Sequence, residues 1–343
     1  MEQHSVQHKV SMDWVYGLLT VLFFYTQLHI ALVFAWDHSI TLVVLVLNLL
    51  CLKLGEAVHE VFDGGNPFIW LVGALIAAIV LFNFPSFFPA FFVFGLFMMK
   101  VRDAAAKQSS RGVKIFARAI GFVCAPIHSA LIYHIYLACV FGVCFYFVKQ
   151  IKMDRAWVRY KITIEENKPV YFTMLTHHAH YFIYAYSIPW LFSVQTNLSF
   201  VWMGVVFYVG WAAYNAYEKL VTPSWGLFIV GHIIAGGALI GLFFSSSLVS
   251  VMFWWFVTGL GGGTVYMLHS LLKTKNSKSS RELRIAEGIG HVFGIACWGA
   301  ISLFYSMEYT FLAGAFLALL TIYTAFNVFI SSTKLNKGMK RHV

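Results

Sequence analysis

Long runs of hydrophobic residues alternate with short polar connections along the whole chain. Four of the runs contain no Asp, Glu, Lys or Arg: Val15–Trp36, Thr41–Cys51, Phe68–Phe82 and Phe311–Ile330. An α-helix rises 1.5 Å per residue, so about 20 apolar residues suffice to cross a bilayer. The pattern therefore predicts helices that span a membrane.

The same pattern, followed through the chain, predicts an all-α polytopic membrane helix bundle with about twelve transmembrane helices in two six-helix halves. The connections least defined by the pattern lie within 67–148. The expected helices are 14–36, 39–61, 67–83, 86–100, 112–128, 130–148, 169–192, 198–217, 224–244, 248–271, 282–305 and 309–331.

Composition agrees with a membrane protein. Hydrophobic residues make up 60% of the chain and charged residues 11%, whereas a soluble domain has roughly half and a quarter. Residues Met1–Met12 are polar, which a cleavable signal peptide would not be. The five cysteines lie in apolar segments without zinc-type spacing, so we expect neither a metal site nor a cofactor from them.

The basic residues can all be placed on one side of the bilayer. They precede the first span, fill the connections that follow spans four, six and ten, and form the tail, whereas Asp37 and Glu308 are the charges left for the other side. The positive-inside rule then places both termini in the cytoplasm of an inner or plasma membrane. The stretch 112–148 must cross twice and turn near Pro126–Ser129. The net charge of +10 lies in loops and predicts no nucleic-acid binding.

Two pairs of similar segments indicate an internal repeat. The segment Gly55–Asp63 parallels Gly210–Glu218, and Ser109–Ile115 parallels Ser279–Ile285. Each pair falls in equivalent connections of the two halves. We therefore expect an N-terminal half at 1–150, a cytoplasmic linker at 151–168, and a C-terminal half at 169–343 that ends in a cytoplasmic tail.

The chain resembles the major facilitator superfamily of secondary transporters over nearly its whole length. That family carries Gly-x-x-x-Asp-Arg-x-Gly-Arg-Arg after its second span; here Gly55 keeps the spacing, while His59 replaces the aspartate and acidic residues replace the basic ones. A fifth-span glycine-proline pattern is echoed by Gly121 and Pro126. The resemblance implies halves related by a pseudo-two-fold axis along the membrane normal. It also implies that spans two and eleven meet near the cytoplasmic side.

The segment that begins the seventh span holds the densest set of candidate residues: Met174, His177, His178, His180 and Tyr181. Helical spacing places Met174, His177 and Tyr181 on one face, which we expect to line a central cavity. Imidazole exchanges protons near neutral pH, and with thioether it suits softer metals. Proton or substrate handling, plain hydrogen bonding between helices and metal binding all remain open.

Further ionisable residues lie inside expected spans, where they are costly and usually face a cavity or another helix. Glu287 and His291 are an i,i+4 pair among glycines, and Glu56 precedes His59 and Glu60. The resemblance implies that Glu56 and Glu287 form an inner gate near His177. Glu287 with His291, and His59 with Glu60, could equally lie at the membrane interface, whereas Glu56 fits that alternative less well.

Single residues are scattered elsewhere in the spans. His29, His134 and His232 each read more simply as packing residues than as site residues, although His29 remains a candidate. Arg118, the deepest basic residue, either reaches the interface or holds an anionic substrate.

The function expected from these features is secondary transport. The substrate would be a small organic solute or a metal chelate, neutral or cationic rather than polyanionic, because deep basic residues are few. The transporter would be a monomer, not an enzyme, and coupled to protons at His177 or His178 with Glu56 and Glu287 in support. Alternatives are a membrane protein with a His-ligated metal or haem, and an assembly or receptor protein.

Overall fold

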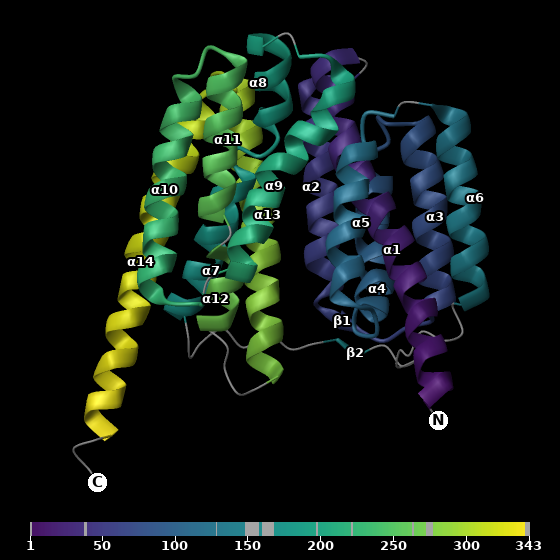
Figure 1. Ribbon diagram of the computed structural model, residues 1–343, viewed down its shortest axis with the longest axis horizontal. Coiled ribbons are helices and arrows are strands. Elements are labelled where there is room, and N and C mark those ends of the chain that lie inside the picture. The colour runs from purple at the N-terminus through teal and green to yellow at the C-terminus, as the bar shows by residue number, and fades with distance from the viewer. Residues whose placement is uncertain are drawn as a thin grey trace. The chain divides into compact units, whose positions relative to one another are not determined.

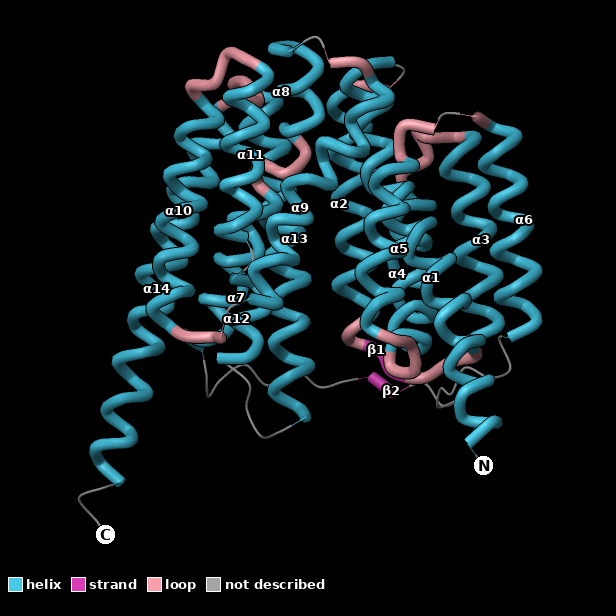
Figure 2. The backbone as a smooth tube through the Cα atoms, viewed as in Figure 1, coloured by secondary structure: helices cyan, strands magenta, loops and turns pink. Residues whose placement is uncertain are grey.

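The chain folds almost entirely into helices. The computed structural model describes residues 2–37, 40–127, 129–147, 158–159, 168–196, 198–220, 222–262, 264–271 and 277–339. Helices dominate this part of the chain (Figure 2). The predicted fold class, an all-α helix bundle, is confirmed.

Two compact units divide the chain. The first comprises Met1–Lys161 together with Asn197–Tyr208, and the second comprises Ile162–Thr196 together with Val209–Val343. Most of the expected linker, at residues 151–157 and 160–167, lies outside the described residues. The division into a linker and two six-helix halves stays a prediction.

The first unit contains six of the expected spans. Its helices (Figure 1) are α1 (Glu2–Leu32), α2 (Leu42–His59), α3 (Pro67–Asn83), α4 (Pro89–Ala106), α5 (Arg111–Cys124) and α6 (Ala130–Phe147). Helix α1 begins well before the predicted start at residue 14. A π-helical turn, Val33–Asp37, extends α1. The predicted turn near Pro126–Ser129 does fall between α5 and α6. Helix α4 runs six residues past its predicted end, so its basic residues lie on the helix rather than in a loop.

The remaining expected spans follow along the chain. Their helices are α7 (Lys168–Phe182), α8 (Ser187–Thr196), α9 (Met203–Leu220), α10 (Trp225–Phe243), α11 (Leu248–Gly262), α12 (Thr264–Leu271), α13 (Ser277–Phe304) and α14 (Tyr309–Met339). A short 3₁₀ turn, Phe200–Trp202, precedes α9.

Two of the predicted spans are interrupted. The span expected at 169–192 divides into α7 and α8, with turns at Ile183–Tyr186. Proline has no N–H and its ring clashes with the carbonyl four residues earlier; for Pro189 that carbonyl belongs to Ala185, inside the interruption. The span expected at 248–271 divides into α11 and α12 beside a run of glycines.

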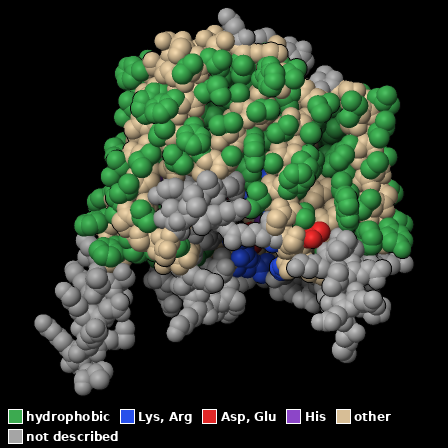
Figure 3. Space-filling view, viewed as in Figure 1, with side chains coloured by type: hydrophobic (Ala, Val, Ile, Leu, Met, Phe, Trp, Pro, Cys, Tyr) green, Lys and Arg blue, Asp and Glu red, His purple; other side chains and the backbone are tan. Residues whose placement is uncertain are grey.

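Apolar side chains cover the outward helix faces. On α14, Phe316, Leu319, Tyr323 and Phe326 are each at least half exposed and recur with helical spacing. Hydrophobic side chains are spread over the described surface in the drawn view (Figure 3). Among the described residues, six helices are long and apolar enough to cross a membrane, and Pro67–Asn83, Phe200–Ala213 and Leu248–Gly262 are shorter apolar helices. The protein is an integral membrane protein.

Glycines bring helices of the first unit into close contact. A Cβ at Gly55 would collide with the Phe92 carbonyl oxygen, and a Cβ at Gly95 with that of Leu52, so α2 and α4 meet at two glycines. A Cβ at Gly121 would lie 2.9 Å from the Val21 carbonyl oxygen, so α5 meets α1 at a third. Small residues of this kind allow helix backbones to approach in membranes.

Equivalent glycines do the same in the second unit. A Cβ at Gly259 of α11 would collide with the Gly210 carbonyl of α9, and a Cβ at Gly290 of α13 would lie 2.5 Å from a carbonyl of α7. The pairs Gly55 and Gly210, Gly95 and Gly259, and Gly121 and Gly290 thus serve the same span-to-span contacts in each unit. This agreement supports the repeat expected from the sequence.

Residues 197–208 pack within the first unit although they follow α8 in the chain. The Trp36 indole N–H donates to the Leu198 carbonyl at 3.3 Å. The rings of Phe207 and Phe122 lie 5.1 Å apart, and a Cβ at Gly204 would lie 2.5 Å from the Phe122 carbonyl oxygen. The first unit therefore uses a segment that comes after the linker.

One short strand pair completes the first unit. Strand β1 (Phe62–Asp63) pairs antiparallel with β2 (Val158–Arg159), with Phe62 opposite Arg159. The Lys100 ammonium of α4 donates to the Phe62 carbonyl. The pairing fixes a piece of the long polar connection beside the end of α2.

Candidate functional site

Helix α7 carries three histidines into the interior of the second unit. His177, His178 and His180 are 2%, 4% and 2% exposed. Met174 is fully buried in an apolar cluster with Phe228 and other apolar side chains. Its predicted place on a cavity-lining face with His177 and Tyr181 stays a prediction.

His177 is hydrogen-bonded to a histidine of α10. Its Nδ1 lies 2.7 Å from Nε2 of His232, and Nδ1 of His232 lies 2.8 Å from the Phe228 carbonyl oxygen. Because a carbonyl only accepts, the His232 Nδ1 carries the proton. In the neutral form its Nε2 then accepts from His177. The second unit thus holds a directional imidazole pair inside an apolar span.

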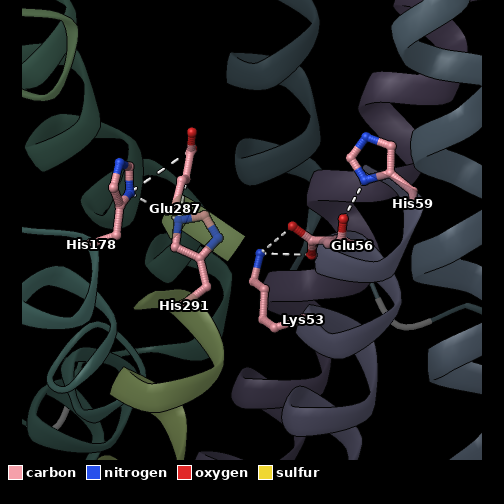
Figure 4. Close-up of polar contacts among 6 residues, drawn as sticks. All are labelled: Lys53, Glu56, His59, His178, Glu287 and His291. Atoms are coloured by element: carbon pink, nitrogen blue, oxygen red, sulfur yellow. Dashed lines mark hydrogen bonds and ion pairs between the residues drawn. The ribbon is translucent and has the colours of Figure 1, made fainter. Parts of the chain in front are cut away.

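His178 faces α13 and meets both residues of the predicted i,i+4 pair (Figure 4). Its Nδ1 lies 3.0 Å from Nε2 of His291, and one Glu287 carboxylate oxygen lies 3.9 Å from each of these nitrogens. A Cβ at Gly290 would lie 3.0 Å from the His178 Cβ. The absence of a side chain at Gly290 is therefore what lets the two histidines meet.

The donor atoms of His178, Glu287 and His291 lie within 4.8 Å of one another. Two imidazoles and a carboxylate are donors that suit divalent first-row metals. Glu287 and His291 are 28% and 13% exposed at their side chains, so these two residues are only partly buried. The arrangement can exchange protons or bind a cation.

His180 points to a different side of α7. Its ring centroid lies 5.6 Å from that of His232 and 5.7 Å from that of Tyr184. Neither ring nitrogen of His180, nor the hydroxyl of the fully buried Tyr184, meets a hydrogen-bond partner among the described residues. Tyr181 stacks edge-on to Tyr184 at 5.7 Å. Buried polar atoms without a hydrogen-bond partner are rare. The His180 and Tyr184 atoms lie beside the break between α7 and α8.

The candidate acidic residue of the first unit has a partner on its own helix (Figure 4). One Glu56 oxygen lies 2.7 Å from the Lys53 ammonium, whose side chain is 3% exposed. Lys53 lies inside α2, within the span expected at 39–61. The buried group is therefore an ion pair of Lys53 with Glu56, and not an isolated carboxylate.

His59 ties the end of α2 to α4. Its Nδ1 contacts the Glu56 carbonyl, and its Nε2 lies 3.1 Å from Asp103 and 3.3 Å from Glu60. The donor atoms of His59, Glu60 and Asp103 also lie within 4.8 Å of one another. His59, which replaces the aspartate of the family signature, thus connects α2 to α4.

His29 belongs to the packing of the first unit. Its Nδ1 lies 2.7 Å from the Ala125 carbonyl oxygen, and its ring stacks on Tyr25 at 4.9 Å. This geometry is that of a hydrogen-bonded core histidine. Its predicted part in substrate handling stays a prediction.

His232 was not among the predicted site residues. As a single histidine it suggests only packing, and the partner that changes its role lies 55 residues away in the chain. The one available signal was a titratable side chain in an otherwise apolar span. Asp103 was missed in the same way, because α4 was predicted to end at residue 100.

No protein-family model matches the sequence, and no curated protein matches it. Solved structures do match. A POT family transporter in complex with 5-aminolevulinic acid has a TM-score of 0.69 at 10% identity, covering 96% of each chain. A bacterial homolog of the human lysosomal transporter Spinster gives 0.62 at 11%, covering 95% of this chain and 97% of that one. The nucleoside transporter NupG gives 0.60 at 11%, covering 94% and 100%. The chain therefore has the fold of transporters of the major facilitator type, as its sequence predicted.

Proposed function

We propose that the protein is a secondary active transporter. It moves a small organic solute or a metal chelate by alternating access, with both termini in the cytoplasm. The proposal is carried by one observation: ionisable side chains that are buried on α7 and α10 and partly buried on α13 lie together in a chain with this fold. Ionisable groups inside a membrane are costly and mark pathways for ions or substrates.

Proton coupling is the mechanism we propose for these side chains. Histidine is the side chain whose proton exchanges near neutral pH, and His177 and His178 each share a hydrogen bond with another imidazole. Glu287 lies beside His178, where its charge interacts with a proton held there. Protonation then biases the conformational equilibrium by its differential interaction with the two states.

A second candidate function is a metal- or haem-containing membrane protein. The donor set of His178, Glu287 and His291 favours it. Absorbance of visible light, or stoichiometric metal in the purified protein, would support this alternative over transport.

The test compares concentrative uptake with counterflow in proteoliposomes. Metabolites that raise the melting temperature of the purified protein supply the substrate. We expect His177→Ala, His178→Ala and Glu287→Gln to lose accumulation driven by a pH gradient and to keep exchange. Glu56 is tested as the neutral pair Lys53→Gln with Glu56→Gln, because Glu56→Gln alone would leave the Lys53 charge buried.

His134→Ala is the matched control. His134 lies on α6 and bonds to the Ala130 carbonyl of its own helix, so this variant should accumulate substrate like the wild type. Proton coupling at these residues is wrong if every variant accumulates substrate as the control does. If the wild-type protein shows neither uptake nor exchange, the proposed transport function is refuted.

A further inference from the structure

Three side chains with metal-binding atoms come together where α7 meets α13. Glu287 and His291 lie about one helical turn apart on α13, and His178 of α7 faces both of them (Figure 4). Gly290 allows this approach, because a Cβ there would lie 2.5 Å from the Leu175 carbonyl oxygen of α7. The two helices thus present two imidazoles and one carboxylate to one another.

Hydrogen bonding accounts for only one side of the triangle that these atoms form. The Nδ1 of His178 and the Nε2 of His291 are 3.0 Å apart, which is the length of a hydrogen bond. The Oε1 of Glu287 lies 3.9 Å from each of these nitrogens, which is too far for a hydrogen bond to either. One carboxylate oxygen therefore stands off both rings by the same distance, as ligands do around a shared ion.

The three atoms surround a point at bonding distance for a metal ion. A triangle with sides of 3.0, 3.9 and 3.9 Å has its centre about 2.1 Å from each corner, and zinc binds imidazole nitrogen and carboxylate oxygen at about 2.0–2.2 Å. An ion about half an ångström out of this plane would still lie about 2.2 Å from all three atoms. The ion needs no separate cavity, because its ligands themselves bound the position that it takes.

The donor types favour a first-row transition ion. Imidazole suits the ions of zinc, copper, iron and nickel, whereas Mg²⁺ and Ca²⁺ require oxygen ligands. Each neutral imidazole carries one ring proton. When the ion replaces the hydrogen bond between the rings, the ring that donated moves its proton to its other nitrogen. The protons then lie on Nε2 of His178 and Nδ1 of His291, and none is lost.

We propose that His178, Glu287 and His291 bind a divalent ion of the zinc type through these three atoms. Three protein ligands leave a fourth position for water or for a donor atom of an organic molecule, as in zinc sites that exchange ligands. Such an exchangeable ion differs from the resident metal or haem of the second candidate function. That it is the metal of a transported chelate rests on the proposed function; the binding itself does not.

Binding is tested on the full-length protein in phosphatidylcholine nanodiscs, after treatment with EDTA and removal of the chelator. The probes are Zn²⁺ and Mg²⁺, and the readout is the melting temperature, which a ligand raises according to its concentration and Kd. We expect Zn²⁺ to raise the melting temperature and Mg²⁺ at the same concentration to leave it unchanged. Co²⁺ is a third probe, because its visible spectrum changes with its ligands and geometry.

His291→Gln and Glu287→Gln each remove one ligand with little change in side-chain size. Loss of a residue that only supports a ligand weakens metal binding about 10–100-fold, so each variant should raise the Kd for Zn²⁺ at least about tenfold. The melting temperature without metal shows whether each variant is folded. His59→Gln is the matched control, because His59 forms a second group of three donors with Glu60 and Asp103 in the first unit. It should bind Zn²⁺ like the wild type.

Gly290→Ala tests the geometry without altering a ligand. The added Cβ would lie 3.0 Å from the His178 Cβ and should push that ring away from His291, so we expect weaker binding of Zn²⁺. Gly237→Ala of α10 is its control, because nothing lies within 4 Å of a Cβ there. That variant should bind Zn²⁺ like the wild type.

Three results would overturn the proposal. The first is an equal affinity for Zn²⁺ in the wild type, His291→Gln and Glu287→Gln. The second is a Co²⁺ spectrum that is the same with the protein as in buffer. The third is weaker binding in His59→Gln alone, which would place the ion at the other group of donors.

Uptake of zinc as its citrate complex into proteoliposomes separates the site from the proposed function. We expect the wild type to accumulate zinc and His291→Gln not to. Zinc binding that depends on these residues, with no uptake of any solute, leaves the site standing and refutes transport. Transport of another solute, with unaltered affinity for Zn²⁺ in the variants, refutes the site and leaves transport standing.

Discussion

At the scale of single residues, a chain of hydrogen bonds joins three helices of the second unit. The Trp298 indole N–H donates to the Ser187 hydroxyl at 2.9 Å, and the hydroxyls of Ser187 and Thr310 lie 2.8 Å apart. Thr310 donates to the Met307 carbonyl at 2.5 Å. Since Thr310 uses its proton there, Ser187 must donate to Thr310. All three side chains are fully buried, so each donor depends on the next acceptor.

We predict that Ser187→Ala destabilises the protein by about 1–3 kcal/mol, because it leaves the Trp298 N–H buried without an acceptor. Adding Trp298→Phe should recover part of the loss. The measurement is thermal unfolding in detergent. Ser193→Ala is the control, because the bond that the Ser193 hydroxyl makes among the described residues is to Trp190 of its own helix. An equal effect of Ser187→Ala and Ser193→Ala would contradict the prediction.

The sequence predicted which residues belong to the candidate site better than it predicted which of them contact one another. The histidines of α7 stand out in any apolar span, and Glu287 with His291 follow from i,i+4 spacing. The spacing defines faces of one helix, but it does not say which helix each face meets. For that reason the pairing of His177 with His232, and of His178 with His291, required the structure.

At the scale of helices, α13 approaches α7 at a glycine. We predict that Gly290→Ala destabilises the protein by about 1–3 kcal/mol, the usual cost of overpacking, and separates His178 from His291. Gly237→Ala on α10 is the control, because nothing lies within 4 Å of a Cβ there. That variant should be neutral or more stable by up to about 1 kcal/mol. Equal melting temperatures for the two variants would contradict the prediction, because α7 would then accommodate a Cβ at Gly290 without loss of stability.

Many helix boundaries were predicted within a few residues, but α1 begins well before its predicted start, α14 ends beyond its predicted end, and the interruptions were not predicted. Hydrophobic length sets where a span begins and ends, and it continues unbroken through Ile183–Tyr186. Pro189 was visible, yet membrane helices often tolerate proline because neighbours satisfy the freed backbone groups. Its effect on this span depended on packing that a single sequence does not contain.

At the scale of the whole molecule, the fold followed from hydrophobic runs and basic loops, and the orientation remains to be measured. We predict that a fluorescent protein fused to the C-terminus of the full chain folds in the cytoplasm, because the tail is rich in Lys and Arg. A fusion after Ser246, between α10 and α11, should instead place a phosphatase on the outer side. The phosphatase is also fused to the C-terminus in a separate protein. Phosphatase activity of that C-terminal fusion on the outer face would refute this orientation.

The position of residues 197–208 bears on the order in which the protein is made. Gly204 and Phe207 pack on the carboxyl end of α5, and Leu198 bonds to Trp36. Ribosomes add about 5–20 residues per second, so Tyr208 is synthesised roughly 2–10 s after Lys161. During that interval the first six spans have been translated but lack their last packing segment. The first unit must therefore stay incompletely packed in the bilayer until the first helices of the second unit have been synthesised.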